Sequence, residues 1–591
     1  MKSESTFFGT VQRVVGAKVF VELSPDLPST NPIVEGRLYR IGQIGTFVRI
    51  PVGFLNLYGV VSSVGTAAPA DTSEEVEGVE APIAVRTVEI QLVGEAYAGG
   101  TFQRGLSEYP TLDDEVHAVT EDDLAAIYRS SAHAQIPIGF HSASENLVAY
   151  LDLDRFVTRH TAIVGSTGSG KSNTVAAILK TLTTGEYPNA RIFVIDPHGE
   201  YGAAFPDVSK VFRIGATKDP LIVPYWALSF DELAWFLVDR KSASESPQDS
   251  ALRDRILEMR QQNAEKAKAN GASKQLTADD VTVDSPIGFS LRELWYFFDR
   301  KERQTFADMP RTKEELIEEG EAATLRSAKF KPAGAGSAAP FKASPPPIMA
   351  VHVAKMLARL RDRRFDFLLN VHDYDGVTKD LDDLVREWTE HEHNITIFDL
   401  AGVPSEIIDL VVGLITRILF ETLFWGRDLA GVGRDRPLLM VFEEAHQYLP
   451  SGEARFIQGY ARRAVQRVLK EGRKYGFGAL VVSQRPAEVD ETILSQCGTF
   501  IALRLTNGSD QSRVRNTVPD ELTGLTGLLP VLRTGEALVL GDAMQIPSRV
   551  RIELVEPRPA STDPPVSDRW HDNRVGHPDY AAAVTSWRRQ R

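Results

Sequence analysis

The 591-residue chain contains a single cysteine, Cys497. One cysteine cannot form an intramolecular disulfide, and it excludes a zinc site built from several cysteines. We therefore expect Cys497 to be a small buried side chain. The first residues, Met1 to Ser5, have no apolar segment behind them, so we expect no signal peptide.

The chain also lacks long apolar runs and an excess of positive charge. No uninterrupted apolar run reaches the roughly 18 residues of a membrane-spanning helix, so we expect no membrane contact and a cytoplasmic location. The 66 basic and 80 acidic residues give a net charge of −14, which argues against a nucleic-acid coat protein. A DNA motor is still compatible with this charge, because a ring can keep its cations in a central channel.

Residues 1–125 consist of short β-branched runs separated by turn residues, without a helical pattern between them. This spacing predicts a small β-barrel. An acidic stretch near residues 71–80 is expected to be an exposed loop. The expected strands are 10–15, 17–22, 46–50, 60–64 and 87–93.

From about residue 145, strands alternate with helices, which is typical of a parallel α/β sheet. We expect the sheet to be built by residues 145–225 and 391–555, with a helical insertion at 226–390 and a C-terminal arm or disordered tail at 556–591. Residues 331–347 are rich in Ala, Gly, Ser and Pro and are expected to be flexible. The expected core strands are 191–196, 395–400, 438–442, 479–484, 500–505 and 536–540, and the expected helices of the insertion are 228–238, 251–269, 291–303 and 351–367.

A glycine-rich segment follows the apolar run 161–164 and precedes a helical pattern, in the order strand, loop, helix. In this context the segment predicts a phosphate-binding P-loop. Its backbone N–H groups would bind phosphate, Lys171 would reach the β- and γ-phosphates, and Ser172 would contact Mg²⁺. ATP and Mg²⁺ are the expected cofactors. The expected nucleotide-binding residues are Gly165, Ser166, Thr167, Gly168, Ser169, Gly170, Lys171, Ser172 and Asn173.

The expected strand 438–442 ends in two acids, Glu443 and Glu444. Acids at the carboxyl end of a core strand lie where a P-loop sheet holds its nucleotide. We expect Glu443 to serve the metal and Glu444 to orient the attacking water. The alternative is an acidic helix N-terminus stabilised by the helix dipole.

Two further strand ends carry polar residues. The segment Asp196-Pro197-His198-Gly199-Glu200-Tyr201 holds more charge than a simple turn needs, and it could complete the Mg²⁺ and water site. Gln484 could contact the γ-phosphate and report its loss, or it could only cap the end of its strand.

A helix expected over 453–475 carries cations along one face: Arg463, Arg467, Lys470 and Lys474, with Arg462 and Arg473 nearby. This face is either solvated or binds an anion, which could be DNA phosphate or the nucleotide of an adjacent subunit. For the second case, Arg473 is the leading candidate for an arginine acting in trans, and Arg159 is the second.

The order of these motifs resembles the HerA branch of the HerA/FtsK motor ATPases. The resemblance rests on the barrel, the P-loop, the segment 196–201, Glu443-Glu444-Ala445-His446, and the segment 471–476 leading to 483–486. It implies a homohexameric ring that moves double-stranded DNA with ATP. The fold it implies is α/β, a RecA-like P-loop core with a HAS-type N-terminal barrel that docks a partner, a helical insertion and a C-terminal arm that braces the next subunit. Lys171 and Ser172 would be Walker A, Glu443 and Glu444 Walker B, and Gln484 the sensor, although the family usually has Asp in the place of Glu443.

The resemblance also suggests partners. Archaeal relatives work with a nuclease in DNA-end resection, and bacterial relatives occur in antiviral defence with a sirtuin-type NADase or a nuclease as effector. We expect the antiviral setting, with the effector docking on the barrel. The alternatives are a ring scaffold in which ATP gates the effector enzyme, and a DNA-end resection motor in repair. A secretion or conjugation ATPase is weakened by the missing membrane span.

Overall fold

The structure is a computed structural model, and it divides the chain into two compact units that are described separately. The first unit comprises residues 1–209, 423–453 and 465–562, and the second comprises 210–422, 454–464 and 563–591. The described residues are 6–25, 33–34, 37–38, 43–67, 85–97, 100–120, 123–124, 127–128, 135–142, 147–184, 186–240, 246–269, 276–335, 338–343, 348–452, 458–518, 523–560, 564–571 and 579–589.

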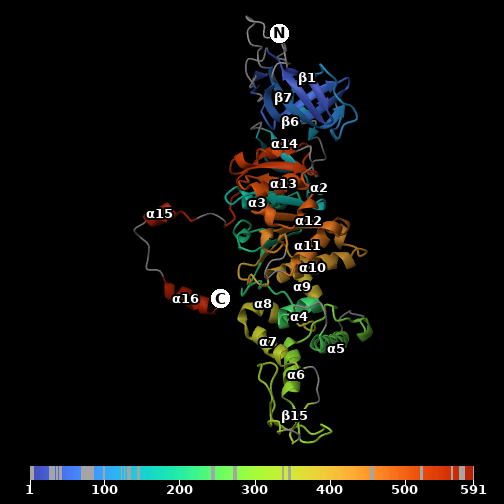
Figure 1. The fold of residues 1–591 in the computed structure, drawn as a ribbon, viewed down its shortest axis with the longest axis vertical. Helices are drawn as coiled ribbons and strands as arrows, with labels where there is room; N and C mark the ends of the chain where they lie inside the picture. The colour runs from blue at the N-terminus through green and yellow to red at the C-terminus, as the bar shows by residue number, and fades with distance from the viewer. Residues whose placement is uncertain are drawn as a thin grey trace, which may run out of the picture. The chain divides into compact units, whose positions relative to one another are not determined.

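The first unit begins with a closed β-barrel, drawn in blue in Figure 1. Six strands stand in the order β2-β1-β9-β5-β6-β7, and pairing between β2 and β7 closes the barrel. The strands are β1 (Phe7–Val15), β2 (Lys18–Leu23), β5 (Phe47–Val52), β6 (Leu55–Ala67), β7 (Val85–Tyr97) and β9 (Glu115–Ala118), and the short β8 (Gln103–Arg104) pairs with β7. Alternate residues of each strand fill the interior with Val, Ile and Leu side chains. The predicted barrel is confirmed, while the acidic stretch 71–80 lies outside the described residues.

The remainder of this unit is an α/β core built on a mixed sheet. Strands β22, β12, β21, β20 and β13 are neighbours in that order and run parallel where their pairing is given. Almost every residue of these strands is buried, as expected for strands covered on both faces. The strands are β12 (Thr161–Val164), β13 (Ile192–Asp196), β20 (Leu438–Phe442), β21 (Phe477–Ser483) and β22 (Thr499–Leu503).

The strands beyond β22 pair antiparallel, so the sheet is mixed and the predicted parallel pattern holds only from β22 to β13. Strand β23 (Glu536–Gly541), which contains the predicted strand 536–540, pairs antiparallel with β22. The order continues through β24 (Ser548–Ile552), β10 (Gln135–His141) and β11 (Val148–Asp152), again antiparallel. Short connections join β23 to β24 and β10 to β11, as in hairpins, and a direct connection of that kind requires antiparallel neighbours.

Helices cover this core, and Figure 1 shows α3, α12 and α13 beside its strands. The predicted helix 453–475 is shorter than expected: α11 spans Tyr460–Glu471, a 3₁₀ turn follows at Gly472–Tyr475, and 453–457 lie outside the described residues. Cys497 is buried, and burial raises the pKa of its thiol to about 12, which confirms the expected inert side chain. The helices are α2 (Leu153–Thr158), α3 (Lys171–Thr183), α12 (Glu491–Ser495), α13 (Gly508–Thr517) and α14 (Thr523–Thr526).

The second unit contains most of the predicted helical insertion. Its helices are α4 (Phe230–Val238), α5 (Pro247–Ala269), α6 (Leu291–Arg303), α7 (Ala350–Arg361), α8 (Asp366–Leu369), α9 (Leu381–Thr389) and α10 (Ile408–Trp425), and its neighbouring strands β14 (Ser209–Arg213) and β19 (Ile395–Asp399) belong to a sheet. The single helix predicted for 351–367 is wrong. Helix α7 ends at Arg361, because the Asp362 carboxylate accepts a hydrogen bond from the N–H of Arg364 and caps a new turn.

The insertion also contains short β-ribbons that the sequence did not predict. Strand β15 (Thr305–Phe306) pairs with β18 (Phe341–Lys342), and β16 (Leu316–Glu318) pairs with β17 (Lys329–Phe330). Strand β18 lies inside 331–347, so two residues of the segment that was expected to be flexible are paired in a ribbon. Residues 336–337 and 344–347 lie outside the described residues.

The end of the chain continues past the core sheet. Residues 553–556 lie along α3, where the Lys180 ammonium donates to the Glu556 carbonyl at 2.8 Å. The start of the predicted arm at residue 556 therefore contacts the helix α3 of the same chain. Two further helices follow, α15 (Val566–His571) and α16 (Tyr580–Arg589). Among the described helices, none is long and apolar enough to cross a membrane.

Candidate nucleotide-binding site

Residues 165–170 connect β12 to α3, and α3 begins at Lys171. Gly170 caps the helix with a φ of +106°, a conformation that residues with a Cβ rarely adopt. A Cβ at Gly165 would lie 2.5 Å from Oγ of Ser169, so the loop also needs glycine there for close packing. This backbone brings successive N–H groups together at the start of a 13-residue helix, which is the geometry of a phosphate-binding loop.

Lys171 lies inside the protein, with only 8% of its surface exposed. Burial lowers the pKa of this ammonium, whereas the negative charges of Glu444, Glu443 and Glu200 raise it. Three carboxylates from two strand ends therefore act on one buried cation beside the loop. The structure thus brings the predicted P-loop and the predicted acid pair together.

Glu443 follows β20 and is almost completely buried. The Tyr201 hydroxyl donates a hydrogen bond to Oε1 of Glu443, and the N–H of Glu444 donates to Oε2 at 3.2 Å. Burial raises the pKa of Glu443 to about 8, and the bond from Tyr201 acts in the opposite direction. Both oxygens of this carboxylate are therefore fixed by hydrogen bonds.

Glu444 adopts a left-handed backbone conformation, with a φ of +48°. Such a conformation is unfavourable for a residue with a Cβ, and it turns the side chain away from the direction of β20. Its Oε2 lies 3.2 Å from Nδ1 of His446, yet it forms no aligned hydrogen bond within the described part of the chain. Glu444 and Glu443 thus point differently, and only Glu444 keeps a buried carboxylate oxygen without a donor.

The turn after β13 is held by its own acid. The Asp196 carboxylate accepts hydrogen bonds from the N–H of Gly199 and of Tyr201, both at 2.9 Å. Asp196 therefore shapes the turn, while the side chains of Glu200 and Tyr201 reach toward the loop. The Ser172 hydroxyl lies 3.4 Å from Oε2 of Glu200.

Gln484 is the first residue after β21, and its side chain reaches the P-loop. The Thr167 hydroxyl donates a 2.7 Å hydrogen bond to Oε1 of Gln484. The predicted sensor and the loop are thus in direct contact.

Asn173 points elsewhere. Its amide donates to the Glu553 carbonyl at 2.8 Å, and its Oδ1 accepts from the N–H of Val555 at 3.0 Å. These bonds hold the C-terminal segment against α3 and occupy the side chain that the sequence had assigned to the nucleotide. The sequence offered no signal for this contact, because Asn173 and Glu553 are 380 residues apart.

Arg473 lies in the 3₁₀ turn after α11 and is exposed. No hydrogen bond or ion pair joins it to the described residues. On α11 itself, the Arg467 guanidinium lies 4.0 Å from Oε2 of Glu471 and 5.2 Å from the Phe424 ring. Arg467 thus has contacts on its own side of the chain, whereas Arg473 is exposed without such a contact among the described residues.

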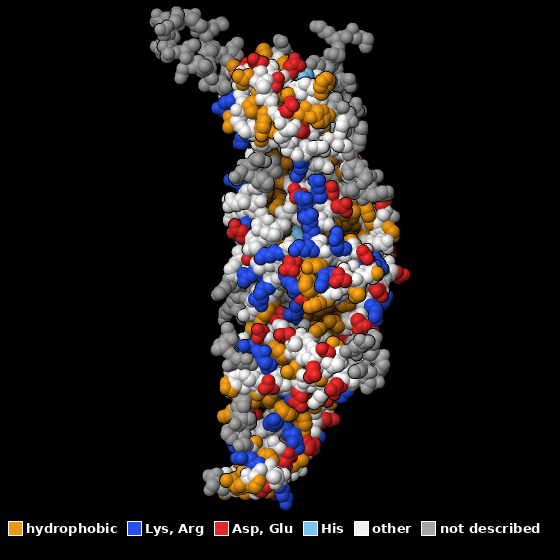
Figure 2. Space-filling view, turned by 90° about the vertical axis from the view of Figure 1, so that its right-hand side faces the viewer, with side chains coloured by type: hydrophobic (Ala, Val, Ile, Leu, Met, Phe, Trp, Pro, Cys, Tyr) orange, Lys and Arg blue, Asp and Glu red, His pale blue; other side chains and the backbone are white. Residues whose placement is uncertain are grey.

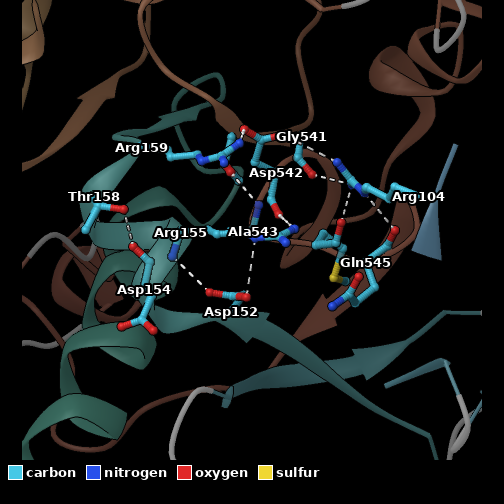
Figure 3. Close-up of polar contacts among 12 residues, drawn as sticks. Arg104, Asp152, Asp154, Arg155, Thr158, Arg159, Gly541, Asp542, Ala543 and Gln545 are labelled. Atoms are coloured by element: carbon cyan, nitrogen blue, oxygen red, sulfur yellow. Dashed lines mark hydrogen bonds and ion pairs between the residues drawn. The ribbon is translucent and has the colours of Figure 1, made fainter. Parts of the chain in front are cut away.

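Arg159 lies at the amino end of β12, opposite the end that carries the P-loop. Figure 3 shows its guanidinium against Asp542, where the ion pair measures 2.5 Å to Oδ2. Arg104 of β8 approaches the same turn from the barrel, 3.5 Å from Oδ1 of Asp542. Arg159 therefore forms an ion pair within its own chain, at the turn that Arg104 of the barrel also contacts.

The donor set suits Mg²⁺ bound together with phosphate. Within the described ranges, no group of three or more His, Cys, Asp or Glu side chains could hold a metal ion alone. Mg²⁺ is usually held by one or two protein oxygens together with substrate phosphates and water. The Ser172 hydroxyl and the buried carboxylates beside Lys171 fit that pattern.

Several contacts at this site escaped the sequence prediction. The sequence places Tyr201 and His446 in motifs and Ser483 at the end of a strand, but it predicts no partner for any of them. In the structure Tyr201 holds Glu443, and His446 lies between Glu444 and Ser483. The unusual Glu at 443 was the one available signal, since a longer side chain needs a different anchor.

Sequence comparisons assign a family to this architecture. A profile of the helicase HerA central domain matches residues 136–419, and a profile of the helicase HerA-like C-terminal region matches residues 418–584. Together the two profiles span residues 136–584, well over half of the chain.

Individual relatives agree with these profiles. A probable helicase of Methanocaldococcus jannaschii is 24% identical over 77% of this chain and 74% of that protein. The DNA double-strand break repair helicase HerA of Pyrococcus furiosus is 26% identical over 74% of this chain and 72% of that protein, and its namesake in Sulfolobus acidocaldarius is 25% identical over 73% and 72%. Among solved structures, the bacterial conjugative coupling protein TrwB aligns with 76% of this chain and 94% of that chain, at 14% identity and a TM-score of 0.41.

Proposed function

Because this chain belongs to the HerA-type helicase ATPases, we propose that it hydrolyses ATP, with Mg²⁺ as cofactor, to translocate along double-stranded DNA. One observation carries the proposal. The buried ammonium of Lys171 lies at the end of a phosphate-binding loop, and three carboxylates act on it. Such a cation exchanges its carboxylate neighbours for phosphate oxygens when a nucleotide binds.

Different residues of the site bind the phosphates and the metal ion. The N–H groups of loop 165–170 and the Lys171 ammonium bind the β- and γ-phosphates. Ser172 and Glu443 would hold Mg²⁺, and the ion would supply positive charge that stabilises the phosphate oxygens.

Glu444 orients and polarises the attacking water. Its Oε2 is buried and receives no aligned hydrogen bond from the described residues, although His446 lies nearby, so this oxygen can accept a proton from a water molecule. Gln484 contacts the P-loop through Thr167 and therefore lies where it can respond to the γ-phosphate.

We further propose a homohexamer in which an arginine of one subunit completes the ATP site of the next. Arg473 supports this role because it is exposed and has no partner in the described part of the chain.

A contact with DNA is compatible with the overall charge of −14. Figure 2 shows Lys and Arg side chains gathered in a band on one face, so positive charge is locally concentrated.

An effector protein, either a nuclease or a sirtuin-type NADase, is proposed to dock on the barrel. Two aromatic side chains are exposed at one end of its β6–β7 pair: Phe54, 88% exposed, and Tyr97, 64% exposed. Leu55, the neighbour of Phe54, pairs directly with Tyr97, so the two rings lie at the same end of the barrel. Exposed aromatic residues of this kind are enriched at protein interfaces.

The named relatives bear on the biological setting. Two of those described above are named as DNA double-strand break repair helicases, which favours a role in DNA repair. The antiviral setting expected from the sequence remains a proposal with no support among these names.

The test is ATP turnover with and without linear duplex DNA. We expect duplex DNA to stimulate hydrolysis by the wild type, Lys171→Ala to lose nucleotide binding, and Glu444→Gln to bind ATP without turning it over. If the rate of ATP hydrolysis is the same with and without duplex DNA of every length tested, the proposed translocase function is refuted. If Glu444→Gln still activates a bound effector, the ATP-gated scaffold is the correct reading.

A further inference from the structure

His446 lies between the two halves of the ATP site and has no role in the proposed function so far. It belongs to the 3₁₀ turn Ala445–Gln447, which begins directly after Glu444. Its Nδ1 lies 3.2 Å from Oε2 of Glu444 and 3.4 Å from Oγ of Ser483. One nitrogen of one imidazole therefore faces both the residue that orients water and the last residue of β21.

Ser483 continues this chain of contacts to the phosphate-binding loop. Its hydroxyl accepts a hydrogen bond from the N–H of Arg485 at 3.0 Å. The residue between them, Gln484, accepts the hydrogen bond from Thr167 of the P-loop. A shift of Gln484 on the arrival or loss of γ-phosphate would thus move the backbone that carries Ser483.

Nδ1 can serve only one of its two neighbours at a time. An Nδ1 that carries a proton donates to the Glu444 carboxylate, whereas a bare Nδ1 accepts from the Ser483 hydroxyl. Burial lowers the pKa of His446, the charges of Glu444 and Glu488 raise it, and those of Arg485 and Lys171 lower it. A neutral imidazole with a single N–H has to choose between the two arrangements.

The backbone conformation of Glu444 requires a contact that maintains it. Its φ of +48° is unfavourable for a side chain with a Cβ, and such conformations persist only where surrounding contacts maintain them. Of the side chains described here, His446 is the one whose ring nitrogen lies within 3.2 Å of the Glu444 carboxylate.

We propose that His446 is a positioning residue that holds Glu444 in its active orientation and couples it, through Ser483 and Gln484, to the occupancy of the P-loop. This inference rests on the proposed ATPase function and deepens it. His446 does not touch the phosphates. It determines when Glu444 is aligned for the attacking water.

The test compares His446→Ala and His446→Asn with the wild type under saturating duplex DNA. We expect His446→Ala to lower kcat for ATP about tenfold, while KM and the affinity for a fluorescent ATP analogue stay within about twofold. In His446→Asn the side-chain amide can donate to Glu444 in place of Nδ1. This variant should bring kcat back to within about threefold of the wild type.

A matched control exists in the insertion. His352 forms the same kind of pair with Asp249, with Nε2 at 3.9 Å and the imidazole 20% exposed, against 12% for His446. His352→Ala removes a comparable side chain far from the P-loop in sequence, and it should leave kcat unchanged.

A double-mutant cycle tests the coupling itself. If His446 and Gln484 act along one chain of contacts, adding Gln484→Ala to His446→Ala should lower kcat by much less than the product of the single effects. Additive effects would overturn the coupling. A merely structural His446 would instead shift KM and thermal stability together, with no rescue by Asn.

The outcomes separate this inference from the proposed function. If the wild type shows no DNA-stimulated hydrolysis, both the proposed function and the proposed role of His446 are refuted. If the wild type and His352→Ala hydrolyse ATP normally and His446→Ala does the same, only the role of His446 is refuted.

Discussion

The Tyr201 hydroxyl donates a hydrogen bond to Oε1 of Glu443, which joins the turn after β13 to the end of β20. The bond fixes the longer side chain that stands where the family usually has aspartate. It also opposes the effect of burial, which raises the pKa of Glu443 to about 8. Tyr201 therefore favours the ionised carboxylate that a metal ion requires.

Tyr201→Phe should weaken the response to Mg²⁺. Without the donor, the pKa of Glu443 rises further and its carboxylate is harder to ionise. A hydrogen bond to a charged group contributes about 1.5 kcal/mol or more, so the Mg²⁺ concentration for half-maximal ATP turnover should rise roughly tenfold. Tyr448→Phe is the control, since that hydroxyl donates to the backbone carbonyl of Glu443 instead. An unchanged Mg²⁺ requirement in Tyr201→Phe would contradict this role.

The buried imidazole of His141 should make the protein less stable in acid. It packs between the rings of Phe47 and Tyr128, and neither ring nitrogen has a hydrogen-bond partner among the described residues. Burial lowers its pKa from 6.5 to about 4. Between these values the unfolded chain binds a proton that the folded chain does not bind, so stability falls as the pH falls through this range.

His141→Phe should therefore protect the protein in acid. The wild type loses about 2 kcal/mol of unfolding free energy from this group between neutral pH and about pH 5, and the variant should not. Urea unfolding at the two pH values measures the difference. His571→Phe, a change at an exposed histidine, should keep the wild-type pH dependence. A His141→Phe protein with the same acid sensitivity as the wild type would rule out this origin.

The sequence predicted the features that depend on local pattern. Strand 438–442 has the expected bounds, and the P-loop lies between a buried strand and a helix because glycine positions and apolar runs encode both. The barrel followed in the same way from strand-length runs. In each case the residues that determine the structure are neighbours in the chain.

Features that depend on distant partners could not be predicted. A buried strand such as 536–541 has the same apolar pattern whether its neighbour runs parallel or antiparallel to it. The pattern therefore predicted the strand but not its direction relative to β22. Arg159 was the second candidate for an arginine acting in trans, and its ion pair with Asp542 could not be predicted because the two residues are 383 positions apart. The hydrogen bonds of Asn173 with residues 553 and 555 could not be predicted for the same reason.

Arg104 should anchor the barrel to the sheet. Its guanidinium donates to the carbonyls of Gly541, Met544 and Gln545, and burial lowers its pKa (Figure 3). Arg104→Ala leaves these acceptors without their donor, at about 1–3 kcal/mol for each one that stays buried. Hydrogen–deuterium exchange should accelerate at 541–545 in this variant. Arg13→Ala, a barrel arginine stacked on Phe20, should leave that segment protected, and equal protection in both variants would refute the anchor.

Arg473 should act on the ATP site of a neighbouring subunit. An arginine that stabilises the transferring phosphate contributes a factor of about 10³ or more, so Arg473→Ala rings should be nearly inactive, as should Lys171→Ala rings. In mixed rings, a Lys171→Ala subunit supplies Arg473 to the intact P-loop of an Arg473→Ala neighbour. Random mixing completes about a quarter of the sites, and turnover should recover to that extent. Lys474→Ala, the adjacent exposed cation, should retain activity without mixing. Mixed rings as inactive as their parents would exclude Arg473 as the trans residue.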